Sequence, residues 1–276
     1  MTQYVDNYRI SSVLRWFGGK HFLSKELVPL LPLHHCWADV FGGGAHMTVA
    51  KKKSTVEVFN DTDNELINFL LVLRSEKLEL IHALESLPTS RTLFESWLYA
   101  ESPVDPFEKA VRWYYLLRQC IIPANGIKSG WRSGKIKNTA KDYQNSITKL
   151  DAFEQRFRQV MIECLDYKDL ITRYDGPDTF FFVDPPYCGR ENYYKGNFKE
   201  HVKLADMLHK IDGKCMVTYY GDPLILELYK DWNCLTFDSK VGTVTKAHLG
   251  QTRRIETEFV FMNYDPPQES KQICLF

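Results

Sequence analysis

Short apolar runs alternate with stretches of helical spacing in the first third of the chain. Residues 36–40 (CWADV) and 56–59 (VEVF) have the composition of buried strands. Each precedes a segment with helical periodicity, one from Ala45 onward and one over 64–74. This order of strand and helix predicts a parallel sheet covered by helices.

The last third returns to the same pattern, whereas the middle differs. Strands are predicted at 180–183, 215–220, 234–237 and 257–264, with helices at 199–211 and 222–230. Residues 75–120 and 143–160 have helical spacing, and the glycine-containing stretch 123–138 is a loop or a hairpin. The chain is therefore predicted to hold an α/β domain of residues 1–74 and 160–276, interrupted by an insertion at 75–159.

Composition adds little about partners but restricts the class of protein. The 276 residues are 44% hydrophobic and 25% charged, which is typical of a soluble globular protein. Lysine plus arginine and aspartate plus glutamate both number 35, so overall charge favours no partner.

The seven cysteines include no CxxC pair, which predicts no metal site and reduced thiols in the cytoplasm. No apolar signal segment opens the sequence, and no run is long enough to span a membrane.

A glycine-rich turn, DVFGGGAHM at 39–47, joins a predicted strand to a predicted helix. Such a turn lets a ligand approach the backbone, although a tight turn without a ligand has the same pattern. Asp61 ends the next strand, where an acidic side chain can accept hydrogen bonds from ribose hydroxyls. A helix cap is the alternative for Asp61 and Asp63. Together the turn and the acid indicate a cofactor that contains a nucleoside.

Two further stretches carry candidate chemistry. In RWFGGK (15–20), a glycine turn brings Trp16 and Lys20 together, which suits a cofactor carboxylate, although a surface turn is the simpler interpretation. In VDPPY (183–187), a buried strand ends on Asp184, at the edge where open α/β sheets bind ligands. Two prolines fix the turn, so the Asp184 carboxylate and the Pro185 carbonyl can accept both hydrogens of one NH₂ group. This arrangement suits the exocyclic amine of a nucleobase, on which Tyr187 can stack.

With these motifs in this order, the chain resembles the alpha group of Dam-type DNA adenine methylases, which use S-adenosylmethionine. The resemblance implies a Rossmann-like methyltransferase sheet with an inserted helical and hairpin target-recognition domain. It assigns catalysis to the DPPY motif, which comprises Asp184, Pro185, Pro186 and Tyr187. It assigns the cofactor pocket to Trp16, Lys20, Phe41, Gly42, Gly44, Asp61 and Asp184.

The insertion has the charge that a DNA-facing segment requires. From Lys109 to Lys141 there are eight lysines and arginines and no acidic residue, interleaved with aromatic residues. A solvated basic helix and loop is the alternative. We expect DNA contacts from a loop with Trp131 near its tip, made by Lys128, Trp131, Arg132, Lys135 and Lys137.

The predicted function is transfer of a methyl group from S-adenosylmethionine to N6 of an adenine flipped out of duplex DNA. An RNA or cytosine-N4 amino-methyltransferase, or a DNA-binding homologue without catalysis, are the alternatives. The sequence leaves open the recognition site and whether a restriction endonuclease is a partner.

Overall fold

The structure, a computed structural model, describes residues 10–121, 129–191, 198–240 and 255–267. Within them the strands form one seven-stranded sheet in the order β3-β2-β1-β4-β5-β7-β6. The strands are β1 (Cys36–Asp39), β2 (Val56–Asn60), β3 (Met161–Glu163), β4 (Thr179–Val183), β5 (Lys214–Tyr220), β6 (Asn233–Lys240) and β7 (Ile255–Met262). The five neighbouring strands β3, β2, β1, β4 and β5 run parallel to one another. Strand β7 lies between β5 and β6 and is antiparallel to both. The predicted Rossmann-like α/β sheet is therefore confirmed.

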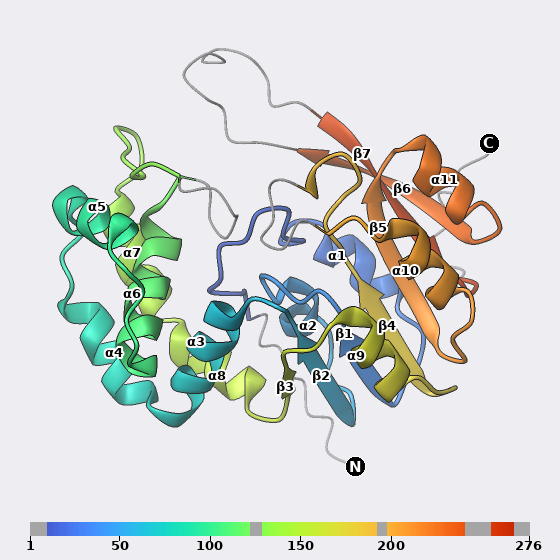
Figure 1. Ribbon diagram of the computed structural model, residues 1–276, viewed down its shortest axis with the longest axis horizontal. Coiled ribbons are helices and arrows are strands. Elements are labelled where there is room, and N and C mark those ends of the chain that lie inside the picture. The colour runs from blue at the N-terminus through green and yellow to red at the C-terminus, as the bar shows by residue number, and fades with distance from the viewer. Residues whose placement is uncertain (1–9, 122–128, 192–197, 241–254, 268–276) are drawn as a thin grey trace.

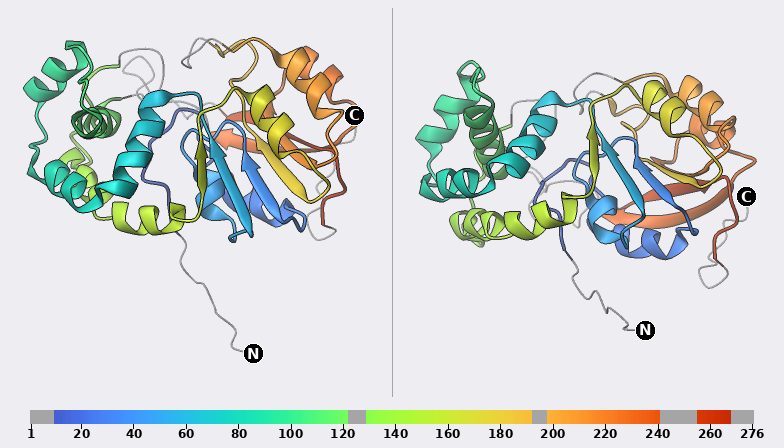
Figure 2. Two further views of the ribbon diagram at one scale, coloured as in Figure 1. Left: turned by 60° about the horizontal axis from the view of Figure 1, so that its bottom comes forward. Right: turned by 90° about the horizontal axis from the view of Figure 1, so that it is seen from below.

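Helices cover both faces of this sheet (Figure 2). One face carries α1 (Ser24–Leu27), the short 3₁₀ helix η1 (Val28–Leu30) and α2 (His46–Ala50). The other carries α9 (Tyr167–Tyr174), α10 (His201–Leu208) and α11 (Pro223–Leu228). The side chains of β4 alternate between the two cores, with Phe180 and Phe182 on the first face and Phe181 and Val183 on the second. This burial on both faces explains the unbroken apolar run of the strand.

The remaining helices lie beside the β3 edge of the sheet (Figure 1). They are α3 (Asn64–Ser75), α4 (Lys77–Ser86), α5 (Arg91–Tyr99), α6 (Pro106–Gln119), α7 (Thr139–Ile147) and α8 (Leu150–Phe157). Helix α6 begins at Pro106, because a first helical position does not need the N–H that proline lacks.

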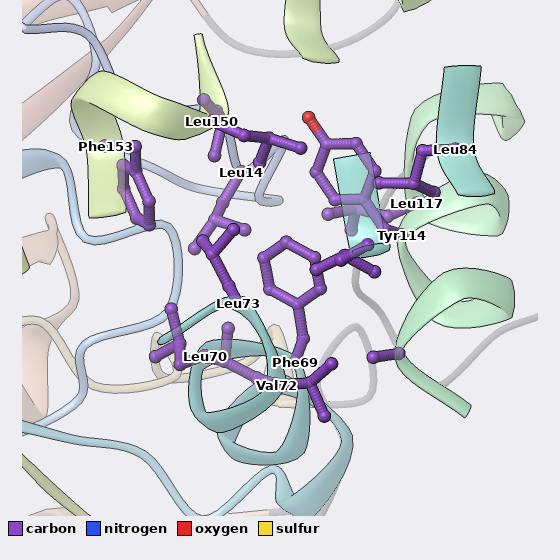
Figure 3. Close-up of a cluster of buried hydrophobic side chains, with 14 of the residues drawn as sticks. Leu14, Phe69, Leu70, Val72, Leu73, Leu84, Tyr114, Leu117, Leu150 and Phe153 are labelled. Atoms are coloured by element: carbon purple, nitrogen blue, oxygen red, sulfur yellow. The ribbon is translucent and has the colours of Figure 1, made fainter. Parts of the chain in front are cut away.

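The core of this helical part includes α3. The rings of Phe69 in α3 and Tyr114 in α6 stack at 4.9 Å, and Leu84 and Leu150 join the same cluster (Figure 3). Phe59 of the sheet belongs to it as well. The predicted boundary at residue 75 therefore coincides with the end of α3, yet the packing continues across it, and the division into two domains stays a prediction.

Four of the described elements were absent from the sequence prediction: α1, η1, β3 and α9. The edge strand β3 has three residues with partly exposed side chains, too few for a periodic pattern. Helix α9 follows β3, and its buried residues Tyr167, Leu170 and Ile171 have the three- and four-residue spacing of a helix, a signal that the prediction did not use. The predicted helix at 143–160 is instead two helices, α7 and α8.

The basic loop closes at its base through an antiparallel bridge between Cys120 and Trp131. Across the described ranges, no helix combines the length and apolar composition needed to span a bilayer.

Candidate active site

Two neighbouring parallel strands, β1 and β4, bring their carboxyl ends together at the middle of the sheet, where the order of strands reverses. Open α/β sheets bind ligands at this switch point, because the loops leave in opposite directions and open a crevice. A pocket lies here, lined by Trp16, Phe17, Gly19, Lys20, Asp39, Phe41, Gly42, Gly43, Gly44, His46, Met47, Phe182 and Asp184. The site thus combines residues from the first fifth of the chain with the DPPY motif.

The glycine turn after β1 forms the floor of this pocket. Gly43 has a φ of 45°, a left-handed conformation that favours glycine, and an added Cβ would come within 2.6 Å of the Trp16 ring. Its N–H donates to Asp61 Oδ2 at 2.8 Å. The turn is therefore fixed both by the close indole and by the acid that ends β2.

Asp61 lies next to the pocket lining but does not itself line the pocket. Its second oxygen, Oδ1, accepts the N–H of Asp63 at 2.8 Å. The cap of α3 is Asp63, whose side chain accepts from Glu65 N–H. The helix-cap alternative thus holds for Asp63, whereas Asp61 shapes the glycine turn.

The segment 16–20 forms the predicted turn, and both Trp16 and Lys20 line the pocket. The Lys20 ammonium, however, is not directed to open solvent. Its side chain is 4% exposed, and Nζ donates to Asp184 Oδ1 at 2.6 Å and to the Gly18 carbonyl at 3.2 Å. Lys20 therefore lines the pocket and also forms an ion pair with Asp184 of the DPPY motif.

The position of Asp184 fits an acceptor for an amine. Thr218 on β5 donates to Oδ1 at 2.7 Å, the same oxygen that binds Lys20. Both described hydrogen bonds thus end on Oδ1, so Oδ2 is the oxygen that can accept a hydrogen bond from a substrate amine. Burial raises the pKa of Asp184, while Lys20 opposes that rise.

Tyr187 is placed differently from a base-stacking residue. It is 3% exposed, and its ring packs against Tyr219 and against Tyr220, edge-on at 4.6 Å. Its hydroxyl accepts from Lys20 Nζ at 2.7 Å and donates to Glu258 Oε1 at 2.5 Å. Stacking on a base stays a prediction, and it requires that one face of this ring become uncovered.

Sequence reasoning missed Asp39, which ends β1 as Asp184 follows β4. Its Oδ2 accepts from Thr48 Oγ1 at 2.7 Å, whereas Oδ1 is buried and has no partner among the described residues. Burial raises the pKa of Asp39 to about 7. Its place at a strand end directly before the glycine turn was the available signal.

Glu258 was missed as well. This buried glutamate lies on β7, and its Oε1 is 3.0 Å from Lys20 Nζ. The available signal was an acidic residue directly before the apolar run 259–262 of a predicted strand, since a buried carboxylate needs a partner.

Comparison with known proteins decides the family. The family model of the D12 class N6 adenine-specific DNA methyltransferases matches residues 16–243. The chain belongs to this family. A DNA N-6-adenine-methyltransferase of Escherichia phage P1 is 27% identical over 240 residues, covering 80% of this chain and 31% of that protein.

Two other relatives agree. Modification methylase StsI of Streptococcus sanguinis is 24% identical, covering 72% of this chain and 32% of the relative. A DNA adenine methylase of Serratia marcescens is 22% identical, covering 79% and 85%. The chain thus spans about a third of the length of the first two relatives and most of the third.

In this D12 class member, the residues predicted to contact DNA divide into four groups. Lys135 and Lys137 are exposed, as the prediction requires. Arg132 forms an ion pair with Asp142 at 2.6 Å, and Lys128 lies outside the described residues. Trp131 is not at the tip that was expected, because it forms the bridge to Cys120 and packs against Phe94, with ring centres 5.5 Å apart. A DNA contact by Trp131 stays a prediction.

Other arginines of the basic segment serve the fold. Arg112 donates to the carbonyls of Trp97, Ala100 and Glu101 at the end of α5. Arg118 donates to the Val13 carbonyl at 3.1 Å. Carbonyls at a helix end lack partners within the helix, which explains the role of Arg112. Arg118 instead ties α6 to the N-terminal segment, so both guanidinium groups are used inside the protein.

The structure also brings together the side chains of Cys188, Glu191 and His201, whose candidate metal-ligating atoms lie within 4.8 Å of one another. These groups already satisfy each other in part: His201 Nε2 is 3.2 Å from Glu191 Oε1, and Gly189 N–H donates to that oxygen at 2.9 Å. The contacts explain the group as a support for the loop after the DPPY motif. The predicted absence of a metal site stays a prediction.

Proposed function

We propose that this chain transfers the methyl group of S-adenosylmethionine to the exocyclic N6 of an adenine in double-stranded DNA. The observation that carries the proposal is the position of Asp184. Its carboxylate lines the pocket at the end of β4, with Oδ1 held by Lys20 and Thr218. The family and the names of the relatives support an adenine amine as the acceptor.

The residues present fit this cofactor. The buried Asp39 Oδ1, which lacks a partner among the described residues, suits the methionine ammonium. Trp16 and Phe41 supply aromatic walls, and Gly42 and Gly44 let the cofactor approach the backbone. Asp61 would accept from the ribose hydroxyls beside the glycine turn. When bound, the cofactor supplies an electrophilic methyl group on a positively charged sulfur.

The task of the protein is to make a weak nucleophile react. The lone pair of N6 is delocalised into the adenine ring, which lowers its nucleophilicity. Hydrogen bonds from the two N6 protons to Asp184 Oδ2 and to the Pro185 carbonyl would favour a tetrahedral nitrogen. Orientation and electrostatic stabilisation would then supply most of the acceleration. Pro186 stiffens the turn, because its φ is fixed.

The base must leave the duplex to reach Asp184, which makes base flipping part of the proposal. We place the DNA-contacting surface on the basic segment of the insertion that carries Lys128, Arg132, Lys135 and Lys137, on both sides of the bridge residue Trp131 in the sequence. The free thiols of the described cysteines agree with a cytoplasmic enzyme. The similarity to a modification methylase leaves room for a restriction endonuclease as partner.

The decisive experiment follows tritium from methyl-labelled cofactor into nucleic acid, with nucleoside analysis of the product. With duplex DNA, the expected product is N6-methyl-2′-deoxyadenosine. Label in N4-methylcytosine, or in RNA alone, would establish the alternative enzymes. Binding of duplex DNA without any label transfer would establish a homologue without catalysis.

A further inference from the structure

The buried ammonium of Lys20 is shared by two carboxylates from distant parts of the chain. Lys20 Nζ lies 2.6 Å from Asp184 Oδ1 and 3.0 Å from Glu258 Oε1. We propose that Glu258 is a positioning residue for methyl transfer, which holds Lys20 and keeps Asp184 a strong acceptor for the substrate amine. This inference rests on the proposed function.

The placement of Glu258 is costly to the fold and calls for a reason. It lies on β7 opposite Tyr220 of β5 and Phe237 of β6, so it is enclosed by strands on both sides. Its side chain is 4% exposed. A buried carboxylate is destabilising unless it is paired, and an apolar residue would meet the packing needs of an inner strand. Its two partners, Lys20 and the hydroxyl of Tyr187, both belong to the active site.

The balance of charge explains what the second carboxylate does. An ion pair of Lys20 and Asp184 alone would have no net charge. The ammonium would then make the electrostatic potential at the acceptor oxygen less negative. With Glu258, one positive group serves two negative groups, so the cluster carries a net charge of about −1 when both carboxylates are ionised. That charge also complements the positive sulfonium of the proposed donor.

The contact between Lys20 and Glu258 also affects how activity depends on pH. Ionisable and polar groups face Asp184 from every surrounding element: Lys20 from the N-terminal turn, Thr218 from β5, Glu258 from β7, Tyr187 from the DPPY loop and Asp39 from β1. Glu258 contributes to the raised pKa of Asp184, after burial. Removal of its charge therefore lowers the pKa of Asp184, and Lys20 then pairs with Asp184 alone.

The test is Glu258→Gln, which keeps an oxygen for the Tyr187 hydroxyl but removes the charge. We expect kcat for methyl transfer to fall on the order of tenfold or more. The acid limb of the kcat profile, which reports ionisation of Asp184, is expected to move to lower pH. Affinity for S-adenosylhomocysteine, whose sulfur is neutral, is expected to stay within twofold, whereas affinity for S-adenosylmethionine falls several-fold.

The ratio of the two cofactor affinities separates this inference from the proposed function, because it does not depend on any nucleic acid. Failure of the parent protein to methylate DNA overturns the proposed function; a changed ratio in the same experiment still supports charge control by Glu258. An unchanged ratio together with an unmoved acid limb overturns the inference while the enzyme remains a methyltransferase.

Two further variants serve as controls, one for the loss of any carboxylate from β7 and one for the charge at position 258. Glu256→Gln removes a carboxylate from the same strand, one that pairs with Arg190 at 2.5 Å, and is expected to leave the acid limb in place. Glu258→Asp restores the charge on a shorter side chain and is expected to return the acid limb to the parental pH. If Glu258→Gln does not fold, Glu258→Leu takes its place, because an apolar side chain suits an inner strand. An acid limb of Glu258→Leu at the parental pH overturns the inference.

Discussion

At the scale of single residues, the active site depends on where a few charges are held. Asp184 and Asp39 end up within one pocket because β1 and β4 are adjacent and parallel. Both carboxyl groups have a raised pKa, with burial as the largest cause.

Asp184→Ala is expected to reduce methyl transfer by at least roughly 10³-fold, because the N6 amine loses its charged acceptor. The protein should remain folded, since the change removes a buried carboxylate rather than packing. Single-turnover transfer and S-adenosylhomocysteine binding measure the two effects. Near-parental turnover in this variant would show that Asp184 is not the acceptor. Thr218→Val, which removes only one hydrogen bond to Oδ1, should lie between the parent and Asp184→Ala.

Asp61→Ala is expected to weaken S-adenosylmethionine binding by about 1.5–3 kcal/mol, the value of a charged hydrogen bond. Asp63→Ala is the matched control, because it removes the cap of α3 two residues away. The control should cost about 0.5–2 kcal/mol of stability and leave cofactor affinity unchanged. Calorimetry that finds equal affinities for Asp61→Ala and the parent would leave Asp61 with a purely structural role.

Asp39 predicts a pH dependence of stability. Its folded pKa of about 7 lies above the ordinary value of 3.8, so between these limits the native protein holds a proton that the unfolded chain has lost. The free energy of unfolding from this group therefore falls as pH rises through that window. Relative to the parent, Asp39→Asn should gain on the order of 2–4 kcal/mol between pH 4 and pH 8. Urea unfolding at both pH values measures this, and the exposed Asp178→Asn should show no such gain.

At the scale of elements, the basic loop separates two uses of positive charge. Arg112 and Arg118 hold helix ends and the N-terminal segment, whereas Lys135 and Lys137 are exposed. Their order in the sequence does not distinguish these uses, because the same residue types serve both.

Alanine at Lys128, Lys135 or Lys137 is expected to weaken binding to all duplexes alike and to lower the salt slope by about one, if the lysine contacts phosphate. A base contact would instead cost about 1–3 kcal/mol at one position of the recognition site. Arg132→Ala should also lose the ion pair to Asp142, so Asp142→Ala is its control. The measurement is DNA affinity against salt on cognate and scrambled duplexes. If all four variants bind like the exposed control Lys53→Ala, the loop is not the recognition element.

At the scale of the whole molecule, one core joins the helical part to the sheet. Phe59, Phe69 and Tyr114 belong to the same buried cluster, although they lie on β2, α3 and α6. Arg15 strengthens this connection, since its guanidinium donates to the Cys120 carbonyl at 2.9 Å, next to the base of the basic loop.

Phe69→Ala is therefore expected to destabilise the entire chain by about 3–5 kcal/mol, as for other large core truncations. Unfolding should remain a single transition, with far-ultraviolet and near-ultraviolet circular dichroism changing together. Leu71→Ala on the same helix removes an exposed side chain and should change stability by less than about 0.5 kcal/mol. Two separate transitions for the parent would show instead that the segment 75–159 folds as an independent domain.

The sequence by itself determined the elements whose pattern is local. The parallel strands, the long helices and the glycine turn follow from periodicity and turn chemistry, and so does the end of a buried strand on Asp184. Strand ends in a parallel sheet meet at one edge, which was sufficient to bring the glycine turn together with Asp184. The resemblance to the family added Trp16 and Lys20 to this pocket.

Tertiary structure alone decided which charges meet. Lys20 lies 238 positions before Glu258 in the sequence, and no periodicity relates them, yet the antiparallel return of β7 beside β5 brings them within 3.0 Å. The burial of Tyr187 and the place of Trp131 at the base of its loop were decided in the same way. A sequence pattern records the preference of each segment for water or for the core, whereas the partner of a buried charge is chosen by the packing of distant segments.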